Sequence, residues 1–259
     1  MTTMSIQYFD ELYKLLSLEL NCAPDDFQKS ESVLTVSAKK GGRAYADEKY
    51  FFHMATAGAN AVITADECLH CFLAEYMKST EGFKLFELPR LLRLETELNK
   101  HGYTLSETYH MFLPRREAAP QKSYPVRWFF DEEIMPFYGD MRFPNAICPQ
   151  YTPNRPDRIV VCAYDDDSIM GMAGSSQDAV GWQQIGIDVN PEYRSMGVGT
   201  YLVTLLKNEL LRRGEIPFYG TSISNYHSWN IAINSGFCPA WVEIGAQKLP
   251  LCEKPLYEA

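Results

Sequence analysis

Residues 190–200 combine the residue types of a loop that could bind an anion. The stretch reads NPEYRSMGVGT, in which Arg194 is followed by Gly197 and Gly199 on either side of a valine. A strand-like run precedes it, and the helix-like run YLVTLL (201–206) follows it. Glycines at such a junction have no Cβ atom to keep a ligand from the backbone, and a helix N-terminus attracts negative charge. The spacing therefore predicts a loop that holds a phosphate or a similar anion.

The helix after this loop is expected to leave its first N–H groups open. Apolar residues recur at helical spacing through residues 198–210, which predicts one face packed on a sheet, and Gly214 suits the helix end. Many helices carry an acid in the first turn, but after Glu192 the next acid is Glu209. The amides at the helix start are therefore free to meet an external anion.

The sequence lacks a residue that each of two well-known phosphate-binding loops requires. A P-loop needs a lysine before its final Ser or Thr, whereas Gly199 precedes Thr200. A dinucleotide-binding loop needs a third glycine where Leu202 stands, which argues against a nicotinamide or flavin dehydrogenase. The pattern Arg194-x-x-Gly197-x-Gly199 between a strand and a helix fits a third type of cradle with no residue missing.

The second half of the chain resembles the GNAT superfamily of acyl-CoA-dependent N-acyltransferases. The signature of that family is Arg/Gln-x-x-Gly-x-Gly/Ala after an apolar strand that often ends Val-x-Pro, and IDVNPEYRSMGVGTYLVTLL (187–206) matches it. A second match is NYHSWNIAINSGF (225–237), in which Asn225 and Ser228 have the spacing of the family's next helix. The resemblance covers about residues 124–250.

This resemblance implies an α/β (α+β) fold with a mixed central sheet flanked by helices, and acetyl-CoA as the co-substrate without a metal. The diphosphate would lie on the N–H groups of residues 195–200, and pantetheine would pair with residues 187–189, where that strand and residues 216–222 splay apart. A backbone N–H near Val189 would stabilise the charge that develops on the thioester oxygen. The reaction implied is direct attack on the thioester by a neutral primary amine, and this amine belongs to a small molecule or a peptide. The residues expected to bind acetyl-CoA are Ile187, Asp188, Val189, Arg194, Ser195, Met196, Gly197, Val198, Gly199, Thr200, Asn225 and Ser228.

The proton donor of the family is missing from its usual place. Many members carry a tyrosine there to protonate the departing thiolate, but this chain has Ala232. Tyr226 and His227 are the candidate catalytic residues, and Tyr219 is a further option in the same region. Histidine titrates in the useful pH range, although an early helix position often exposes it to solvent.

The base that would take the ammonium proton is not decided by the sequence. Some members use a glutamate on the central strand, and the corresponding position is about Gln183, which cannot act as a base alone. Asp178, Asp188 and Glu192 are close in sequence, and the choice among them stays open. A second class of function therefore remains, a catalytically silent regulatory protein that binds acyl-CoA.

The elements that position these residues fall into two parts. The stretch LPRREAAPQKSYP (113–125) combines prolines with mixed charge, and it predicts a smaller N-terminal α/β domain (1–118) before the acetyltransferase domain (119–259). The role of the first domain is open between a degenerate copy of the same fold and an unrelated cap. Expected elements include a helix from about 131, with acids suited to its start, and two short strands at the C-terminal end.

Composition excludes several classes of protein. The net charge is −9 and neither half has a basic stripe, which argues against nucleic-acid binding. No stretch approaches the ~18–20 apolar residues that cross a bilayer, and the first residues lack the pattern of a signal peptide, so a cytoplasmic location is expected. A homodimer is one arrangement that the sequence leaves open.

The cysteines do not suggest a metal site or a disulfide framework. Seven cysteines are scattered through the chain, and only Cys68 and Cys71 have metal-like spacing, without a second ligand pair. We expect these two thiols to be buried in a helix that Asp66 caps. Residues 165–167 are three aspartates, which predicts a solvated turn.

Overall fold

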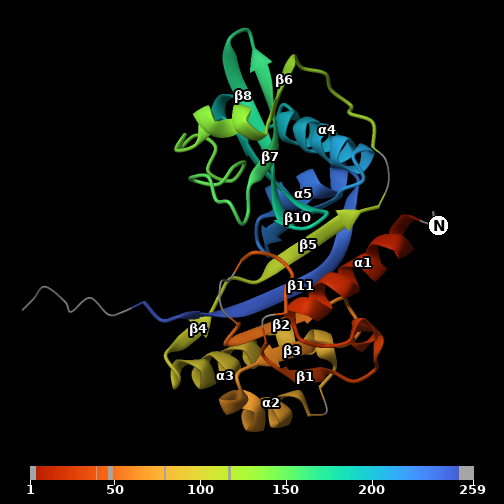
Figure 1. The fold of residues 1–259 in the computed structure, drawn as a ribbon, viewed down its shortest axis with the longest axis vertical. Coiled ribbons are helices and arrows are strands. Elements are labelled where there is room, and N and C mark those ends of the chain that lie inside the picture. Colours follow the sequence, from red (N-terminus) through yellow and green to blue (C-terminus); the bar gives the residue numbers. More distant parts are fainter. Residues whose placement is uncertain (1–3, 39, 46–48, 79, 116–117, 251–259) are drawn as a thin grey trace, which may run out of the picture.

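The computed structural model describes residues 4–38, 40–45, 49–78, 80–115 and 118–250, and one mixed sheet runs along it (Figure 1). The strand order is β1-β3-β2-β11-β5-β10-β9-β8-β7-β6, with β4 paired to β11. The strands are β1 (Val33–Val36), β2 (Phe52–Thr56), β3 (Val62–Ala65), β4 (Tyr103–Leu105), β5 (Tyr109–Pro114), β6 (Val126–Phe130), β7 (Asp157–Asp165), β8 (Ser168–Ala179), β9 (Trp182–Val189), β10 (Ile216–Ser222) and β11 (Phe237–Lys248). The α-helices are α1 (Met4–Glu19), α2 (His70–Met77), α3 (Leu88–Asn99), α4 (Val198–Arg212) and α5 (Tyr226–Asn234). This architecture confirms the predicted central sheet with flanking helices and an α/β N-terminal part.

Strand β5 connects the two parts of the chain. It lies before the predicted boundary at residue 118, yet in the sheet it is antiparallel both to β10 and to β11. Strand β11 continues past β5 to pair with β2, with Val242 opposite Thr56. The backbone hydrogen bonds of the sheet therefore run without interruption between the N-terminal strands and those of the second half.

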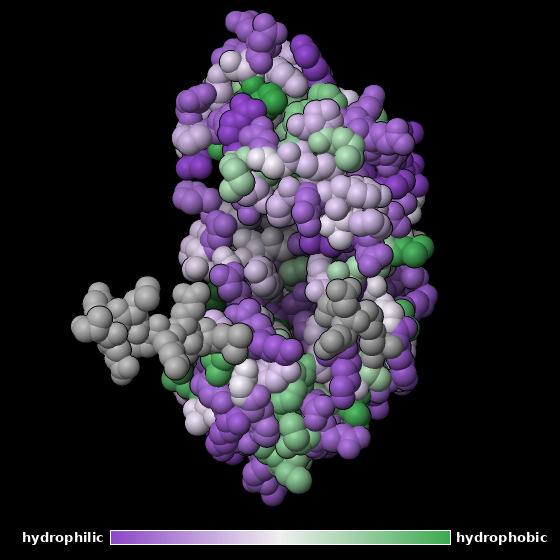
Figure 2. All heavy atoms as spheres, turned by 60° about the vertical axis from the view of Figure 1, so that its left-hand side comes forward, coloured by the Kyte–Doolittle hydropathy of each residue, from purple (hydrophilic) through white to green (hydrophobic). Residues whose placement is uncertain are grey.

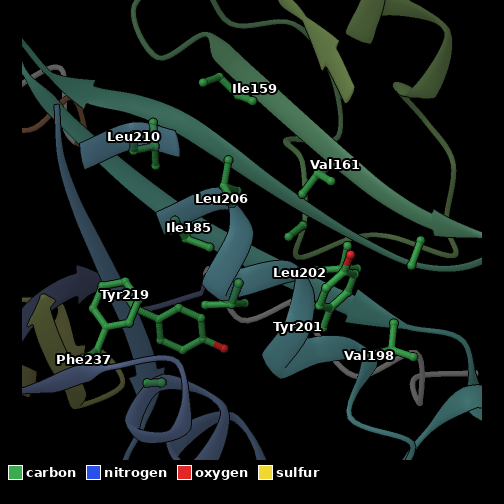
Figure 3. Packing of buried hydrophobic residues seen from close by; sticks show 14 of the residues in the cluster. Ile159, Val161, Ile185, Val198, Tyr201, Leu202, Leu206, Leu210, Tyr219 and Phe237 are labelled. Atoms are coloured by element: carbon green, nitrogen blue, oxygen red, sulfur yellow. The ribbon is translucent and has the colours of Figure 1, made fainter. Parts of the chain in front are cut away.

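Helix α4 packs on one face of β7, β8 and β9 through the apolar stripe that the sequence predicts. Leu202, Leu206 and Leu210 are fully buried and lie against Val161 and Ile185 of the sheet (Figure 3). The helix ends at Arg212, and Gly214 follows in the left-handed conformation with φ 80°, as the helix-end prediction requires. The packed stripe fixes where the N-terminus of α4 meets the end of β9.

The parallel strands β9 and β10 pair over only part of their length. Their register runs from Ile216 opposite Trp182 to Tyr219 opposite Ile185. Beyond that point β9 pairs with β8, as in Gly186 opposite Gly174, and β10 pairs with β5. The predicted divergence of the two strands is therefore confirmed, and it exposes the edge of β9 over its last residues.

Several predicted elements differ from the structure. Residues Asp131–Phe137 form a 3-10 helix (η4) that contains Pro136, where an α-helix was expected. The two short strands expected at the end are one strand, β11, with an irregularity between Pro239 and Trp241. Within the described ranges, no helix is long and apolar enough to cross a membrane.

The expectation of two buried thiols is wrong. Residues 67–69 form a 3-10 turn (η2), and Asp66 accepts a hydrogen bond from the Cys68 backbone N–H, so the predicted cap is present. Cys68 and Cys71 are nevertheless exposed, because the short helix α2 buries Leu73 and Tyr76 instead. The turn at residues 165–167 is exposed, as predicted.

A buried ion cluster ties α1 to β11. The Arg43 side chain is fully buried, and its Nη2 lies 2.7 Å from Oε2 of both Glu19 and Glu243. The indole of Trp241 donates to Glu243 at 2.8 Å. Burial opposes the ionisation of Glu243, but Arg43 outweighs it and holds the pKa of that carboxyl well below its usual range. The cluster joins the two parts of the chain through buried opposite charges that compensate one another.

Candidate active site

A cleft of about 910 Å³ opens where β9 and β10 diverge. Its walls are the end of β9, the loop before α4, the start of α5, and a segment at residues 144–149. Figure 2 brings forward the side that carries residues 131–156 in Figure 1, and this surface is hollowed at mid-height. The cleft is therefore bounded by elements that are far apart in sequence.

The predicted anion loop leads into a helix N-terminus whose first backbone N–H groups are not capped by a side chain. Ser195 has φ 62° and Gly197 has φ 89°, both in the left-handed region. Gly197 is the N-cap of α4, no side chain caps it, and no acid lies in the first turn. The Tyr124 hydroxyl donates to the Met196 carbonyl at 2.7 Å, which holds the loop from outside. The first amides of α4 are thus left without a side-chain acceptor, as an anion site needs.

The two glycines of the loop are needed for different reasons. Position 197 favours glycine because its backbone is left-handed, a conformation that residues with a side chain rarely adopt. A Cβ there would stand 3.4 Å from the Lys122 side chain, which is an ordinary contact. A Cβ on Gly199 would lie 3.0 Å from Cδ1 of Ile231 and 3.4 Å from Val189. Gly199 therefore lets α4 approach α5 and β9 closely, a packing role that the sequence argument had not separated from ligand approach.

The structure brings most of the predicted acetyl-CoA residues together. Met196 is the exception, since its side chain is 43% exposed and does not line the cleft. The Asn225 side chain accepts from the Ser228 N–H at 3.1 Å and caps the N-terminus of α5. The predicted residues that line the cleft are Ile187, Asp188, Val189, Arg194, Ser195, Gly197, Val198, Gly199, Thr200, Asn225 and Ser228.

The two candidate catalytic residues are placed differently. His227 lines the cleft, whereas Tyr226 is 72% exposed and does not. Tyr219 lines the cleft at the last β9–β10 pair and is almost fully buried. Its hydroxyl lies 2.7 Å from Oγ of Ser228. Burial raises the pKa of Tyr219 to about 12, so the phenol keeps its proton at neutral pH and can donate it.

Among the candidate bases, only Asp188 lines the cleft. Gln183 is buried on β9 away from it, and its neighbour Gln184 faces the cleft instead. Gln184 Oε1 accepts from the Tyr45 hydroxyl at 2.9 Å and from Arg155 at 3.0 Å. Successive side chains of a strand point to opposite faces of the sheet, so Gln184 rather than Gln183 presents its side chain to the cleft.

The wall at residues 144–149 and two charged residues near it were missed. Arg155 donates to Asp178 at 2.7 Å, and Asp157 accepts from the Cys148 N–H at 3.1 Å. Burial raises the pKa of Asp157. All of these lie in or beside a loop rich in Pro and Asn. This loop has no helical or strand periodicity, so the sequence predicts turns there but not that they line the cleft.

Comparison with solved structures returned proteins at low identity, several of which are described as GNAT-family acetyltransferases. A GNAT-family protein of Novosphingobium aromaticivorans aligns at 16% identity over 56% of this chain and 66% of its own, with a TM-score of 0.41. The protein yncA of Salmonella typhimurium, solved with acetyl-CoA, aligns at 13% identity over 52% of this chain and 98% of its own, with a TM-score of 0.36. A Drosophila protein aligns at 12% identity over 94% of this chain and 88% of its own, with a TM-score of 0.48. This chain spans less than two thirds of the Novosphingobium protein.

The comparison with curated protein sequences found no match. A family model described as "Acetyltransferase (GNAT) family" matches residues 110–237. That range starts within β5 and ends at the first residue of β11, so it contains the loop before α4, the divergent strands and α5. Residues 110–237 therefore match the GNAT acetyltransferase family.

Proposed function

We propose that this protein is an N-acetyltransferase that moves an acetyl or short acyl group from acetyl-CoA to a primary amine. The observation that carries the proposal is that one cleft contains both the open start of α4 and the free edge of β9 beyond Ile185. The first suits a diphosphate and the second suits an extended amide chain, so the two surfaces together match the two parts of coenzyme A.

Acetyl-CoA supplies an acyl group on a thioester, and the residues of the chain hold the reactants and move protons. The amine nitrogen forms a bond to the carbonyl carbon, the C–S bond breaks, and the ammonium loses one proton while the thiolate takes one. The free N–H groups at the end of β9 are suited to the negative charge that develops on the carbonyl oxygen.

Tyr219 is the proton donor that the geometry supports best. Its hydroxyl lies in the cleft at the point of divergence, within hydrogen-bond distance of Ser228, and it is protonated at neutral pH. The fully buried Ala232 belongs to the same apolar cluster as the Tyr219 ring. A tyrosine from β10 thus reaches the region of α5 that the family's usual tyrosine would occupy. His227 remains the second candidate, and Tyr226 is disfavoured by its exposure.

The alternative is an acyl-CoA-binding regulatory protein without turnover. Its support is that Gln184, which cannot accept a proton as a carboxylate does, faces the cleft from β9. Calorimetric titration with acetyl-CoA followed by thiol release across a panel of small amines and amine-bearing peptides separates the two functions. Binding with amine-dependent thiol release supports the enzyme, binding without it supports the regulator, and no binding at millimolar acetyl-CoA contradicts both.

A further inference from the structure

Residues 144–149 lie directly on the backbone of β8 and β9. A Cβ on Gly186 would stand 1.8 Å from the Asn145 carbonyl oxygen, and one on Gly174 would stand 2.1 Å from that of Ala146. Both distances are far inside any real contact, so only glycine is compatible with the segment in this place. The two strands therefore carry glycines where this segment covers them.

Asp188 holds the segment from the end of β9. Its Oδ2 accepts from the backbone N–H of Asn145 at 2.6 Å and from that of Ala146 at 2.9 Å. Its Oδ1 accepts from the Asn145 side-chain amide at 2.6 Å. Hydrogen bonds to an ionised acceptor are stronger than neutral ones, so three of them on one carboxylate make a firm anchor. Both carboxylate oxygens are used in this way.

The rest of the segment is fixed as well. Phe143, Ala146 and Ile147 are buried in an apolar cluster with η4 and the outer face of β7 and β8. At its other end, the Cys148 N–H donates to the buried Asp157. The segment is thus held by carboxylates on either side of a packed apolar core.

The segment and the acetyl-CoA surfaces lie on opposite faces of β9. Ile185, Ile187 and Val189 pack toward α4 and α5. Gly186 and Asp188, which alternate with them, contact the segment. An acceptor that approaches the thioester from the face opposite α4 therefore meets residues 144–149, since these residues line that side of the cleft.

We propose that Asp188 is a positioning residue that fixes residues 144–149 as the acceptor wall of the cleft, and that this wall sets which amine is accepted. The inference rests on the proposed transferase function. It assigns Asp188 neither proton transfer nor a direct contact with acetyl-CoA, since both of its oxygens hold the segment.

Asp188→Ala and Asp188→Asn test the proposal together. The alanine variant loses all three bonds and should raise the KM for the amine about tenfold, equivalent to about 1.4 kcal/mol, with the Kd for acetyl-CoA within about twofold. The asparagine variant keeps one oxygen that can accept from both backbone N–H groups, so its KM should rise no more than about threefold. If the carboxylate instead took the ammonium proton, both variants would lose kcat equally and the pH–rate profile would lose its acidic limb, which would overturn the proposal.

Gly186→Ala provides an independent perturbation, because its Cβ pushes Asn145 away without touching the Asp188 carboxylate. It should raise the KM for the amine as Asp188→Ala does, while Asp167→Ala, at an exposed turn, serves as the matched control. An unchanged KM for the amine in Asp188→Ala and Gly186→Ala, or an equal loss of acetyl-CoA affinity, overturns this inference alone. Absence of amine-dependent turnover in the unmodified protein overturns the proposed function, and this inference with it.

Discussion

Replacing Tyr219 by phenylalanine isolates the role of one hydroxyl. The ring would keep its neighbours, since the Phe237 and Phe112 rings lie 6.1 and 6.4 Å away between centroids. The loss is the 2.7 Å hydrogen bond to Ser228. A neutral hydrogen bond contributes about 1 kcal/mol, so the variant should fold with a modest loss of stability.

The effect on activity should be much larger than the effect on stability. A positioned general acid contributes typically ~10²–10⁴-fold, and we expect kcat to fall about 100-fold, the lower end, because water can also protonate a thiolate. The Kd for acetyl-CoA should stay within about twofold, since the hydroxyl acts on the leaving group rather than on the bound diphosphate. Because the pKa of Tyr219 is about 12, kcat should show no fall from its ionisation between pH 8 and about 10.

The assay is thiol release at saturating acetyl-CoA and amine, with binding measured by calorimetry. Ser228→Ala is the matched control, because it removes the same hydrogen bond and leaves the phenol in place. It should lower kcat less than the loss of the phenol does. A thioester with a more acidic thiol should reduce the defect, because its thiolate needs no proton to leave. A kcat within twofold of normal would refute the assignment, and a larger loss in His227→Ala would transfer the role to that imidazole.

Further predictions concern the loop, the ion cluster and pH. Gly197→Ala should cost about 1 kcal/mol in unfolding free energy because of its left-handed backbone, and it should raise the Kd for acetyl-CoA in calorimetry; an unchanged Kd would argue against the cradle. Arg43→Met should cost about 3–5 kcal/mol in urea unfolding at pH 7, because Glu19 and Glu243 stay buried without their partner, and a loss below about 1 kcal/mol would contradict this. The pKa of Tyr219 is raised from 10.0 to about 12, so the folded protein keeps a proton that the unfolded chain releases above pH 10, and stability should fall as pH rises. At pH 11 this loss is about 1.4 kcal/mol, and the unfolding free energy of Tyr219→Phe, measured in urea, should lack this contribution.

The local signals in the sequence were enough for the elements around the loop. Gly197 in the left-handed conformation, the uncapped start of α4 and the Asn225 cap of α5 all follow from residue types a few positions apart. The apolar stripe of α4 likewise repeats within one helix. These features are readable because their physical causes are local: backbone sterics, a missing first-turn acid and helical periodicity.

Other features could not be read because distant segments create them. The exposure of Cys71 depends on which face of α2 meets the sheet, and a short helix gives too few residues to decide that face. Strand β11 is continuous because β5 and β2 both offer it hydrogen-bond partners, which a local pattern does not reveal. The acids at residues 131–133 marked a helix start but not that the helix would be of the 3-10 type.

The sequence by itself determined the strand–loop–helix unit of residues 182–212 and the family that this unit indicates, because a tight turn and an amphipathic helix are specified by neighbouring residues. Only the tertiary structure decided that Tyr219 meets Ser228, that Gln184 rather than Gln183 faces the cleft, and that Asp188 anchors residues 144–149. Each of these depends on register and on contacts between segments far apart in the chain. A side chain's place in such contacts follows from how the whole sheet packs, and no local pattern carries that information.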